Sequence, residues 1–452
     1  MKKIVLIFFI AILNTILFSS AKLLFPGTIE YYYQKSLNMY AGIQYTGFPL
    51  LYKNDSEYKS SILFKIPLGY EKRLENTVIF DGGGYSTLEK DEIFFSDMYK
   101  EYYSWLDFGF EFYHNKNLYA QFIVDFKEGN SPYFKYKSMN IYDIYKDASI
   151  LTRTTLDTPS LSYLSLNEKK WSMVLGRTPI SLGPLKNSLL ISDASKYYEN
   201  INFKVKLPDI TCNSILISMQ PMMTKTEYEK QFSTDATLAF KEVWVNRIDY
   251  ESYAINIGLS TLGLYGGEIP STPFDVKNAL AGIDIQYQKM PFRLYFQDAY
   301  NPIKQKNSYG YGVEILLKPL KELFISGQYE YYSVDAGIYE DDIPYNRLYN
   351  RSLEIINDPG ARYFYDYPLG FKYDENSKAT SLSGYISSKN WLLYYENEFG
   401  TSFGEEFKVQ KIKGIINIPL IENLEFKYIN MEYGDERYNI YSIFTTIPLK
   451  LK

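Results

Sequence analysis

The stretch 309–319, Tyr-Gly-Tyr-Gly-Val-Glu-Ile-Leu-Leu-Lys-Pro, decides the fold. Every second residue is apolar or aromatic, and these positions are Tyr309, Tyr311, Val313, Ile315 and Leu317. The alternate positions are small, polar or charged, namely Ser308, Gly310, Gly312, Glu314 and Lys318, with Leu316 as the one apolar exception. Because successive side chains of a β-strand point to opposite faces, the pattern predicts a strand with one apolar and one polar face. We therefore expect Glu314→Arg to destabilise the protein much less than Val313→Arg.

The same alternation recurs along the chain. Clear two-faced strands are predicted at Leu118–Phe126, Tyr253–Leu259, Ala279–Tyr287, Phe292–Phe296, Leu323–Tyr331 and Trp391–Phe399. Weaker patterns lie at Trp171–Gly176, Asn202–Leu207, Cys212–Met219, Val243–Asp249, Thr380–Ser387, Phe407–Ile418, Leu424–Tyr433 and Tyr441–Leu449. With their hairpin partners these make roughly 16 to 18 strands, each near the length that a tilted membrane-spanning strand requires.

The N-terminus has the features of an export signal. Lys2 and Lys3 precede an apolar run from Ile4 to Phe18, and Ser19-Ser20-Ala21 is a small-residue cleavage site. The run is shorter than the roughly 20 residues of a membrane-spanning helix, which argues against the alternative of a retained anchor. We therefore expect residues 1–21 to be a signal peptide that is cut before Lys22.

Composition narrows the class of protein. The chain holds 47 Tyr and 29 Phe, and tyrosine favours membrane–water interfaces, although a tyrosine-rich soluble β-sandwich or β-helix is the alternative. Loss of Lys2 and Lys3 takes the formal net charge from −5 to −7, which argues against a nucleic-acid partner. Together with the export signal, the strands predict an all-β, transmembrane antiparallel β-barrel in the cell outer membrane, with membrane lipid as a partner and one chain as the unit.

The predicted connections are of two lengths. Short links, such as those around Pro319 and Pro419, alternate with long ones at Glu128–Pro159, Thr261–Asn278 and Val334–Lys378. Outer-membrane barrels have short turns at the periplasmic end and long loops outside, so we expect long extracellular loops. Residues 103–452 are assigned to the barrel. Residues 22–102 could supply either its first strands or a periplasmic plug.

Catalytic groups are sparse. His114 is the only histidine, and no nucleophile motif surrounds it, which argues against a serine–histidine mechanism. Cys212 is the only cysteine, so the chain has no His/Cys cluster with zinc spacing and cannot form an internal disulfide. The acidic run Glu340-Asp341-Asp342 fits a solvated loop better than a calcium site. We therefore expect no enzymatic activity, no metal and no cofactor.

The segment Gly176–Phe203 resembles the Wzi-like capsule assembly family. The matching elements are Gly176-Arg177, Gly183-Pro184, Ser188-Leu-Leu-Ile-Ser-Asp193 and Asn200–Phe203, whereas Leu182 and Leu185 replace the Trp and Gly that the family usually has there. The resemblance implies an outer-membrane barrel of about 18 strands that associates with surface polysaccharide and is occluded by a plug and loops. The family's N-terminal part is helical, but residues 22–81 of this chain predict strands and loops.

Two sets of residues are candidates for polysaccharide binding. In the long connection Val334–Lys378, Tyr363, Phe364, Tyr365 and Tyr367 offer flat rings that could stack on sugars at low entropic cost. Arg177 and Asp193 flank a strand-to-strand connection, where they either form a buried ion pair or contact the ligand. The leading hypothesis is a non-catalytic barrel that binds or organises surface polysaccharide, and the alternative is a porin-like channel for small solutes.

Overall fold

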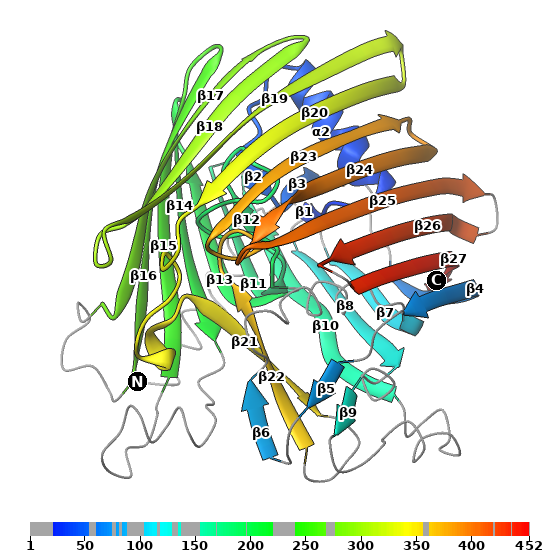
Figure 1. The fold of residues 1–452 in the computed structure, drawn as a ribbon. Helices are drawn as coiled ribbons and strands as arrows, with labels where there is room; N and C mark the ends of the chain where they lie inside the picture. The colour runs from blue at the N-terminus through cyan, green and yellow to red at the C-terminus, as the bar shows by residue number, and fades with distance from the viewer. Residues whose placement is uncertain are drawn as a thin grey trace, which may run out of the picture.

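The strands of the chain close into one antiparallel barrel (Figure 1). The computed structural model describes residues 21–53, 60–74, 78–80, 84–87, 104–114, 118–128, 134–136, 154–168, 170–195, 197–219, 240–267, 276–355, 361–418, 421–434 and 436–451. The predicted signal peptide, apart from Ala21, lies outside these residues. Each barrel strand pairs with the next along the chain, and the last strand pairs with the first from Tyr438 opposite Leu74 to Leu451 opposite Ser60.

The barrel contains 18 strands among the described residues, which confirms the predicted number. In chain order they are β4 (Ser60–Leu74), β7 (Ser104–His114), β8 (Leu118–Glu128), β10 (Thr154–Asn167), β11 (Trp171–Thr178), β13 (Tyr198–Lys206), β14 (Ile210–Met219), β15 (Phe240–Glu251), β16 (Ile255–Gly267), β17 (Asn278–Lys289), β18 (Phe292–Asn301), β19 (Lys306–Leu320), β20 (Leu323–Val334), β23 (Ser377–Ser387), β24 (Trp391–Ser402), β25 (Glu405–Ile418), β26 (Ile421–Tyr433) and β27 (Glu436–Leu451).

Strand β19 shows the two faces that its sequence predicts. Tyr311 and Leu317 are 45% and 48% exposed on the outside, whereas Glu314 is fully buried on the inside. The apolar exception, Leu316, also points inward, where it packs against Met39 of an N-terminal helix. Its apolar character therefore reflects a covered part of the lumen rather than a break in the alternation.

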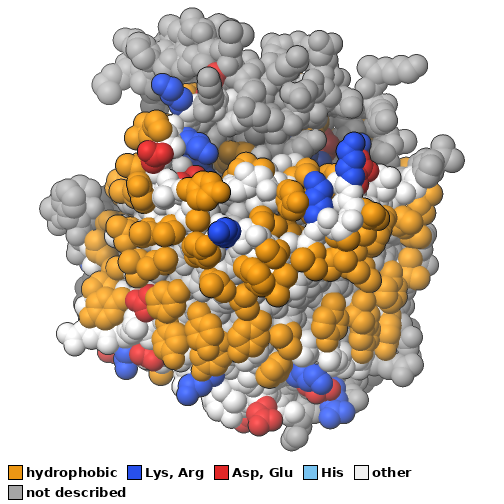
Figure 2. Space-filling model, turned by 90° about the horizontal axis from the view of Figure 1, so that it is seen from above, with side chains coloured by type: hydrophobic (Ala, Val, Ile, Leu, Met, Phe, Trp, Pro, Cys, Tyr) orange, Lys and Arg blue, Asp and Glu red, His pale blue; other side chains and the backbone are white. Residues whose placement is uncertain are grey.

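The outer surface carries the apolar face of many strands. Figure 2 shows one side of the molecule, on which hydrophobic side chains form a broad band and most charged side chains lie at its edges. Exposed outward residues of neighbouring strands contribute to this surface, among them Leu294, Tyr311 and Leu393. Such a band matches the hydrocarbon layer that a transmembrane barrel must cover. None of the helices in the described part of the chain is long and apolar enough to cross a membrane.

The two rims of the barrel differ. Tight hairpins join β17 to β18, β19 to β20, β23 to β24 and β25 to β26 at one rim, which we call the short-turn end (Figure 1). The long connections β8–β10, β16–β17 and β20–β23 lie at the opposite rim, as predicted, together with β14–β15, which was not predicted. One of them is shorter than expected, because β16 continues to Gly267.

The connection from β20 to β23 has secondary structure of its own. It contains a 3-10 helix, η3 (Pro344–Asn346), and the antiparallel strands β21 (Tyr349–Ile355) and β22 (Ala361–Pro368). Strand β22 also pairs in parallel with β6 (Gly84–Thr87), and β5 (Val78–Phe80) pairs with β9 (Phe134–Tyr136). We call residues 335–355 and 361–376 the cap segment.

Residues 21–53 form a separate N-terminal segment, which precedes the first barrel strand in the sequence. It comprises β1 (Ala21–Leu24), α2 (Ile29–Tyr40), β2 (Gly47–Phe48) and β3 (Leu50–Lys53). The expectation of only strands and loops here is wrong for α2. Its tyrosines favour strands in isolation, but Thr28 caps the helix by accepting a hydrogen bond from the Tyr31 backbone N–H, and Tyr31 and Tyr32 are buried. Residues 22–102, predicted to supply either strands or a plug, thus contain both a barrel strand, β4, and elements that lie inside the barrel.

Candidate functional site

The N-terminal helix α2 is fixed to the inner wall by a buried group of charges. The Lys35 ammonium lies 3.0 Å from Glu314 on β19, and the Arg293 guanidinium on β18 lies 2.7 Å from the same carboxylate. Ser326 on β20 donates a further hydrogen bond to Glu314. Burial lowers the pKa of Lys35, although the Glu314 carboxylate acts in the opposite direction. The helix is therefore joined to the barrel by one carboxylate that serves two cations.

This arrangement reverses the expectation that Glu314 is easily replaced. An arginine at this position would place a third positive charge against Lys35 and Arg293 in a site closed to water. Uncompensated buried charges are strongly destabilising. The inward face of β19 is polar, but it is not a solvated face.

A loop also crosses the lumen, next to the N-terminal helix. We call residues 183–195, which lead from β12 (Ser181–Leu182) toward β13, the inner loop. Gly183 has a φ of 103°, and a Cβ at this position would clash with the Gln297 side chain, so the predicted Gly-Pro turn needs glycine here. The Arg293 guanidinium donates to the Pro184 carbonyl at 2.6 Å, and the Leu189 backbone N–H donates to Gln297.

Carboxylates of the barrel wall hold the middle of the inner loop. Glu330 accepts hydrogen bonds from the Lys186 backbone N–H and from Tyr295. The Lys186 ammonium lies 2.7 Å from Glu396 and 3.4 Å from Glu398. Burial disfavours the charged ammonium, but these two carboxylates outweigh that effect and raise the pKa of Lys186. The loop is thereby fixed by charged groups that belong to strands on one side of the barrel.

The cap segment covers the inner loop from the other side. The Tyr339 hydroxyl donates to the Leu189 carbonyl at 2.8 Å, and the Ser192 backbone N–H donates to the Leu369 carbonyl at 2.7 Å. Asn301 of β18 donates to the Ile338 carbonyl. A large buried apolar cluster includes residues of both segments and of the barrel wall. The N-terminal segment, the inner loop and the cap segment thus occupy successive levels of the lumen.

Arg177 and Asp193 occupy the two ends of the connection that contains the inner loop. Arg177 belongs to β11 and pairs in the sheet with Glu199 of β13, and its guanidinium lies 5.7 Å from the centre of the Tyr197 ring. Asp193 follows Ser192, which is bound to the cap segment. An ion pair between Arg177 and Asp193, or a role of either residue in ligand contact, stays a prediction.

The predicted aromatic residues of the cap segment lie on a strand. Tyr363, Phe364 and Tyr365 pair with Glu354, Leu353 and Ser352 of β21 in turn, but their side chains lie outside the described part of the structure. Tyr367 is only 7% exposed and belongs to the apolar cluster that closes the lumen. Tyr367 thus contributes to packing, and polysaccharide stacking by the other three stays a prediction.

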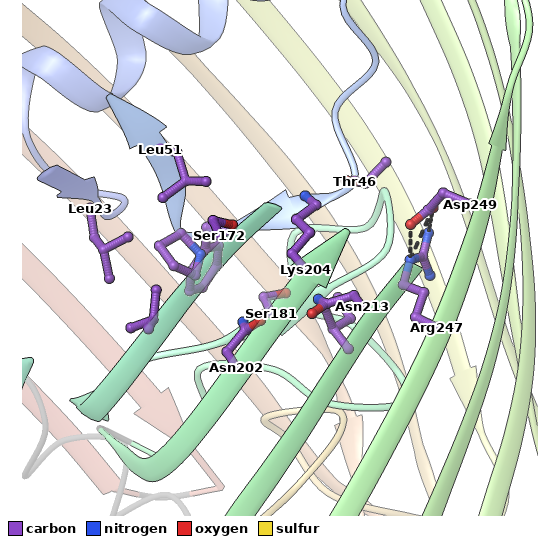
Figure 3. A pocket seen from close by; sticks show the side chains of 15 residues that line it. Leu23, Thr46, Leu51, Ser172, Ser181, Asn202, Lys204, Asn213, Arg247 and Asp249 are labelled. Atoms are coloured by element: carbon purple, nitrogen blue, oxygen red, sulfur yellow. Dashed lines mark hydrogen bonds and ion pairs between the residues drawn. The ribbon is translucent and has the colours of Figure 1, made fainter. Parts of the chain in front are cut away.

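A pocket remains between the N-terminal segment and strands β11 to β15 (Figure 3). It encloses about 540 Å³ of space, part of which is open to solvent. One wall carries Ser172, Asn202, Lys204 and Asn213, and Figure 3 shows these side chains rising from neighbouring strands toward the N-terminal segment. The pocket lies near the short-turn end, since Ser172 is the second residue of β11.

Arg247 closes one side of this pocket. Its guanidinium is bound by Asp249 at 2.5 Å and by Asp284 at 2.5 Å, and it also donates to Ser260. Arg247 is 2% exposed, so two carboxylates balance one buried cation. The charge of Arg247 is therefore already satisfied by the protein.

A second pocket lies across the Tyr45–Phe48 segment from the first. Tyrosines line it, and it encloses about 480 Å³ of space, part of it solvent. The lining tyrosines are Tyr31, Tyr32, Tyr45, Tyr385 and Tyr394. Sequence reasoning missed both pockets, because their walls come from strands and an N-terminal segment that are far apart in the chain. The three tyrosines at positions 31–33 were the one available signal.

Where the structure describes them, the charged groups inside the barrel form no metal site. No group of three or more His, Cys, Asp or Glu side chains with suitable geometry occurs among the residues that the structure describes. The inner carboxylates Glu314, Glu330 and Glu398 are instead bound by lysine, arginine, tyrosine and amide donors.

Comparison with known proteins supports the fold. No protein-family model and no curated protein sequence matches the chain. Among solved structures, Wzi of Escherichia coli is described as an outer membrane protein involved in group 1 capsule assembly and as a carbohydrate-binding β-barrel. It matches 87% of this chain and 85% of its own, with 12% sequence identity and a TM-score of 0.56. The chain has the fold of the Wzi outer-membrane barrel.

A second solved structure is more distant. The outer membrane protein OpdK from Pseudomonas aeruginosa covers 87% of this chain and 99% of its own, with 8% identity and a TM-score of 0.45. At 12% identity the comparison with Wzi establishes the architecture alone. The resemblance found at Gly176–Phe203 is thus confirmed for the fold, and that segment forms the inner loop and its flanking strands.

Proposed function

We propose that the protein is a non-catalytic outer-membrane barrel that binds or organises surface polysaccharide. The observation that carries the proposal is the occupied lumen, in which the N-terminal segment, the inner loop and the cap segment are joined to the wall by buried ion pairs. A barrel for free passage of solutes needs a continuous aqueous path instead. The similarity of the fold to a carbohydrate-binding barrel supports the same proposal.

In this proposal the short-turn end faces the periplasm and the long connections face outward. The hairpin of β21 and β22 would then lie toward the polysaccharide. Tyr363, Phe364 and Tyr365 supply the aromatic rings that stack on sugars, because such rings lose little entropy on binding. Tyr367 is left out of this set, because its buried side chain supports the cap segment.

The test measures polysaccharide on cells that carry variants of the protein. Joint replacement of Tyr363, Phe364 and Tyr365 by alanine should release polysaccharide into the medium while the purified barrel keeps its heat resistance. Tyr253→Ala is the matched control, because this tyrosine is 95% exposed in the turn between β15 and β16 and is expected to change neither property. Retained polysaccharide with altered solute uptake would overturn the proposal in favour of a channel.

A further inference from the structure

Four inward-facing residues form a continuous row across neighbouring strands near the short-turn end. Ser172 of β11 lies opposite Lys204 of β13, Lys204 lies opposite Asn213 of β14, and Asn213 lies opposite Arg247 of β15. Directly opposed residues in antiparallel strands have their Cβ atoms about 5 Å apart. We call these four residues the polar row. Asn202 is two residues from Lys204 on β13 and faces the same pocket.

Most of the polar groups that line this pocket have unused hydrogen-bonding capacity. In the part of the chain that the structure describes, the side chains of Ser172, Asn202 and Lys204 make neither a hydrogen bond nor an ion pair. The buried Asn213 Oδ1 and Ser181 Oγ also lack partners, and Ser181 is 1% exposed. Buried polar atoms are normally satisfied by protein or by ordered water. A ligand that displaces water from this pocket would therefore find hydrogen-bond partners in these groups.

The opposite wall of the pocket is apolar and comes from the N-terminal segment. The apolar residues of the N-terminal segment that line the pocket are Leu23, Phe48, Pro49 and Leu51. Backbone pairing of β2 with β12 holds this wall in place, since Phe48 lies opposite Ser181. Apolar walls with a few convergent polar groups are the usual composition of small-molecule sites.

The charges select the class of ligand. Arg247 is neutralised by Asp249 and Asp284, whereas Lys204 makes no ion pair among the described residues and interacts with Asp249 and Glu251 only at longer range. An ammonium in such a position offers a charge-assisted hydrogen bond to a carboxylate. Serine and asparagine side chains beside it supply the donors and acceptors that hydroxyl groups require.

We propose that this pocket binds a sugar acid, with its carboxylate on Lys204 and its hydroxyl groups on Ser172, Asn202 and Asn213. The proposal rests on the proposed function and specifies one saccharide unit that the barrel would hold. It places this unit inside the barrel at the short-turn end, far along the strands from β21 and β22. The pocket is thus separate from the predicted aromatic contacts of the cap segment.

The experiment is isothermal titration of the purified, folded barrel with D-glucuronate and with D-glucose. Glucuronate should bind more tightly than glucose, and Lys204→Gln should weaken glucuronate binding roughly 10- to 100-fold, as expected for loss of a charged hydrogen bond. Lys289→Gln is the matched control, because Lys289 is exposed at the end of β17 at the same rim and does not line the pocket. Asn202→Ala, which keeps all charges, should weaken both ligands by a smaller factor.

Three results would overturn the proposal. Equal binding of glucose and glucuronate contradicts the assignment of a sugar acid, and equal loss in the Lys204 and Lys289 variants contradicts the role of Lys204. No measurable binding of glucuronate to the intact barrel contradicts the pocket itself. Lys204→Gln leaves the β21–β22 hairpin unchanged, and the triple aromatic variant leaves the pocket unchanged. Polysaccharide release by the triple variant therefore tests the proposed function, whereas glucuronate titration of the Lys204 variant tests the pocket.

Discussion

The two sides of the barrel lumen use their inward polar residues differently. On the side formed by β18, β19, β20 and β24, the carboxylates Glu314, Glu330 and Glu398 are bound by groups of the N-terminal helix and the inner loop. On the side formed by β11, β13 and β14, Ser172, Lys204 and Asn213 face a pocket. The polar groups of the first side bind the N-terminal helix and the inner loop. The second side is polar with its hydrogen-bonding groups still available.

This difference teaches that inward polarity alone does not identify a binding surface in a barrel. Both sides have the same alternation in sequence, and both would be described as a polar lumen. Only the partners of each side chain separate a structural carboxylate from a residue that can receive a ligand. Substitutions on the two sides should therefore have opposite consequences for stability and for binding.

The largest effect should come from Glu314→Ala. This change leaves Lys35 and Arg293 buried without their shared carboxylate, and removal of one partner from a buried ion pair typically costs about 3–5 kcal/mol. Urea unfolding of the barrel refolded into lipid vesicles measures the free energy of unfolding. Lys204→Gln, on the other side of the lumen, should change it by less than about 0.5 kcal/mol, since this side chain makes neither a hydrogen bond nor an ion pair in the described structure. A similar loss in both variants would remove the distinction between the two sides.

A smaller loss is expected for Val313→Arg on the outer face of β19. An arginine that faces the middle of the bilayer destabilises a barrel by about 2–4 kcal/mol, and by about 0–1 kcal/mol near the interface. Leu320→Arg is the control, because Leu320 is 65% exposed at the end of the same strand. The same unfolding measurement in lipid vesicles applies. If the two variants lose the same free energy, this strand does not separate lipid from lumen.

The smallest effect concerns the ends of the inner-loop connection. If Arg177 and Asp193 form the predicted ion pair, a double-mutant cycle of Arg177→Ala and Asp193→Ala should give an interaction energy of about 0.5–3 kcal/mol in the free energy of unfolding. Tyr197→Phe in place of Asp193→Ala is the control, since it keeps the ring that lies beneath Arg177. Additive losses would exclude the pair. Stable single variants that release polysaccharide from cells would instead indicate ligand contact.

Much of the barrel could be predicted from the sequence, because it follows from local alternation. The pattern at Tyr309–Leu317 gave the correct faces of β19, and the predicted strands at Leu323–Tyr331 and Trp391–Phe399 begin where β20 and β24 begin. The weakest predictions concern segments inside the barrel. Helix α2 and strands β21 and β22 depend on burial against the wall, which an isolated segment does not reveal.

The candidate site was harder to predict for the same reason. Gly176–Phe203 was singled out from its sequence, but the wall residues that hold it, Arg293, Glu330 and Glu398, are 109, 144 and 211 positions from the residues they bind. The polar row depends on the register of several strands, and a shift of one residue would turn Lys204 outward. Sequence patterns fix the period of each strand but not its register with its neighbours.

The central claim is that the lumen is occupied and closed to free passage. Single-channel recording of the purified full-length protein in a planar lipid bilayer tests it most directly. The account predicts no steady conductance, because the N-terminal segment, inner loop and cap segment fill successive levels of the barrel. A large, steady conductance through the intact protein would contradict the account and would favour a solute channel.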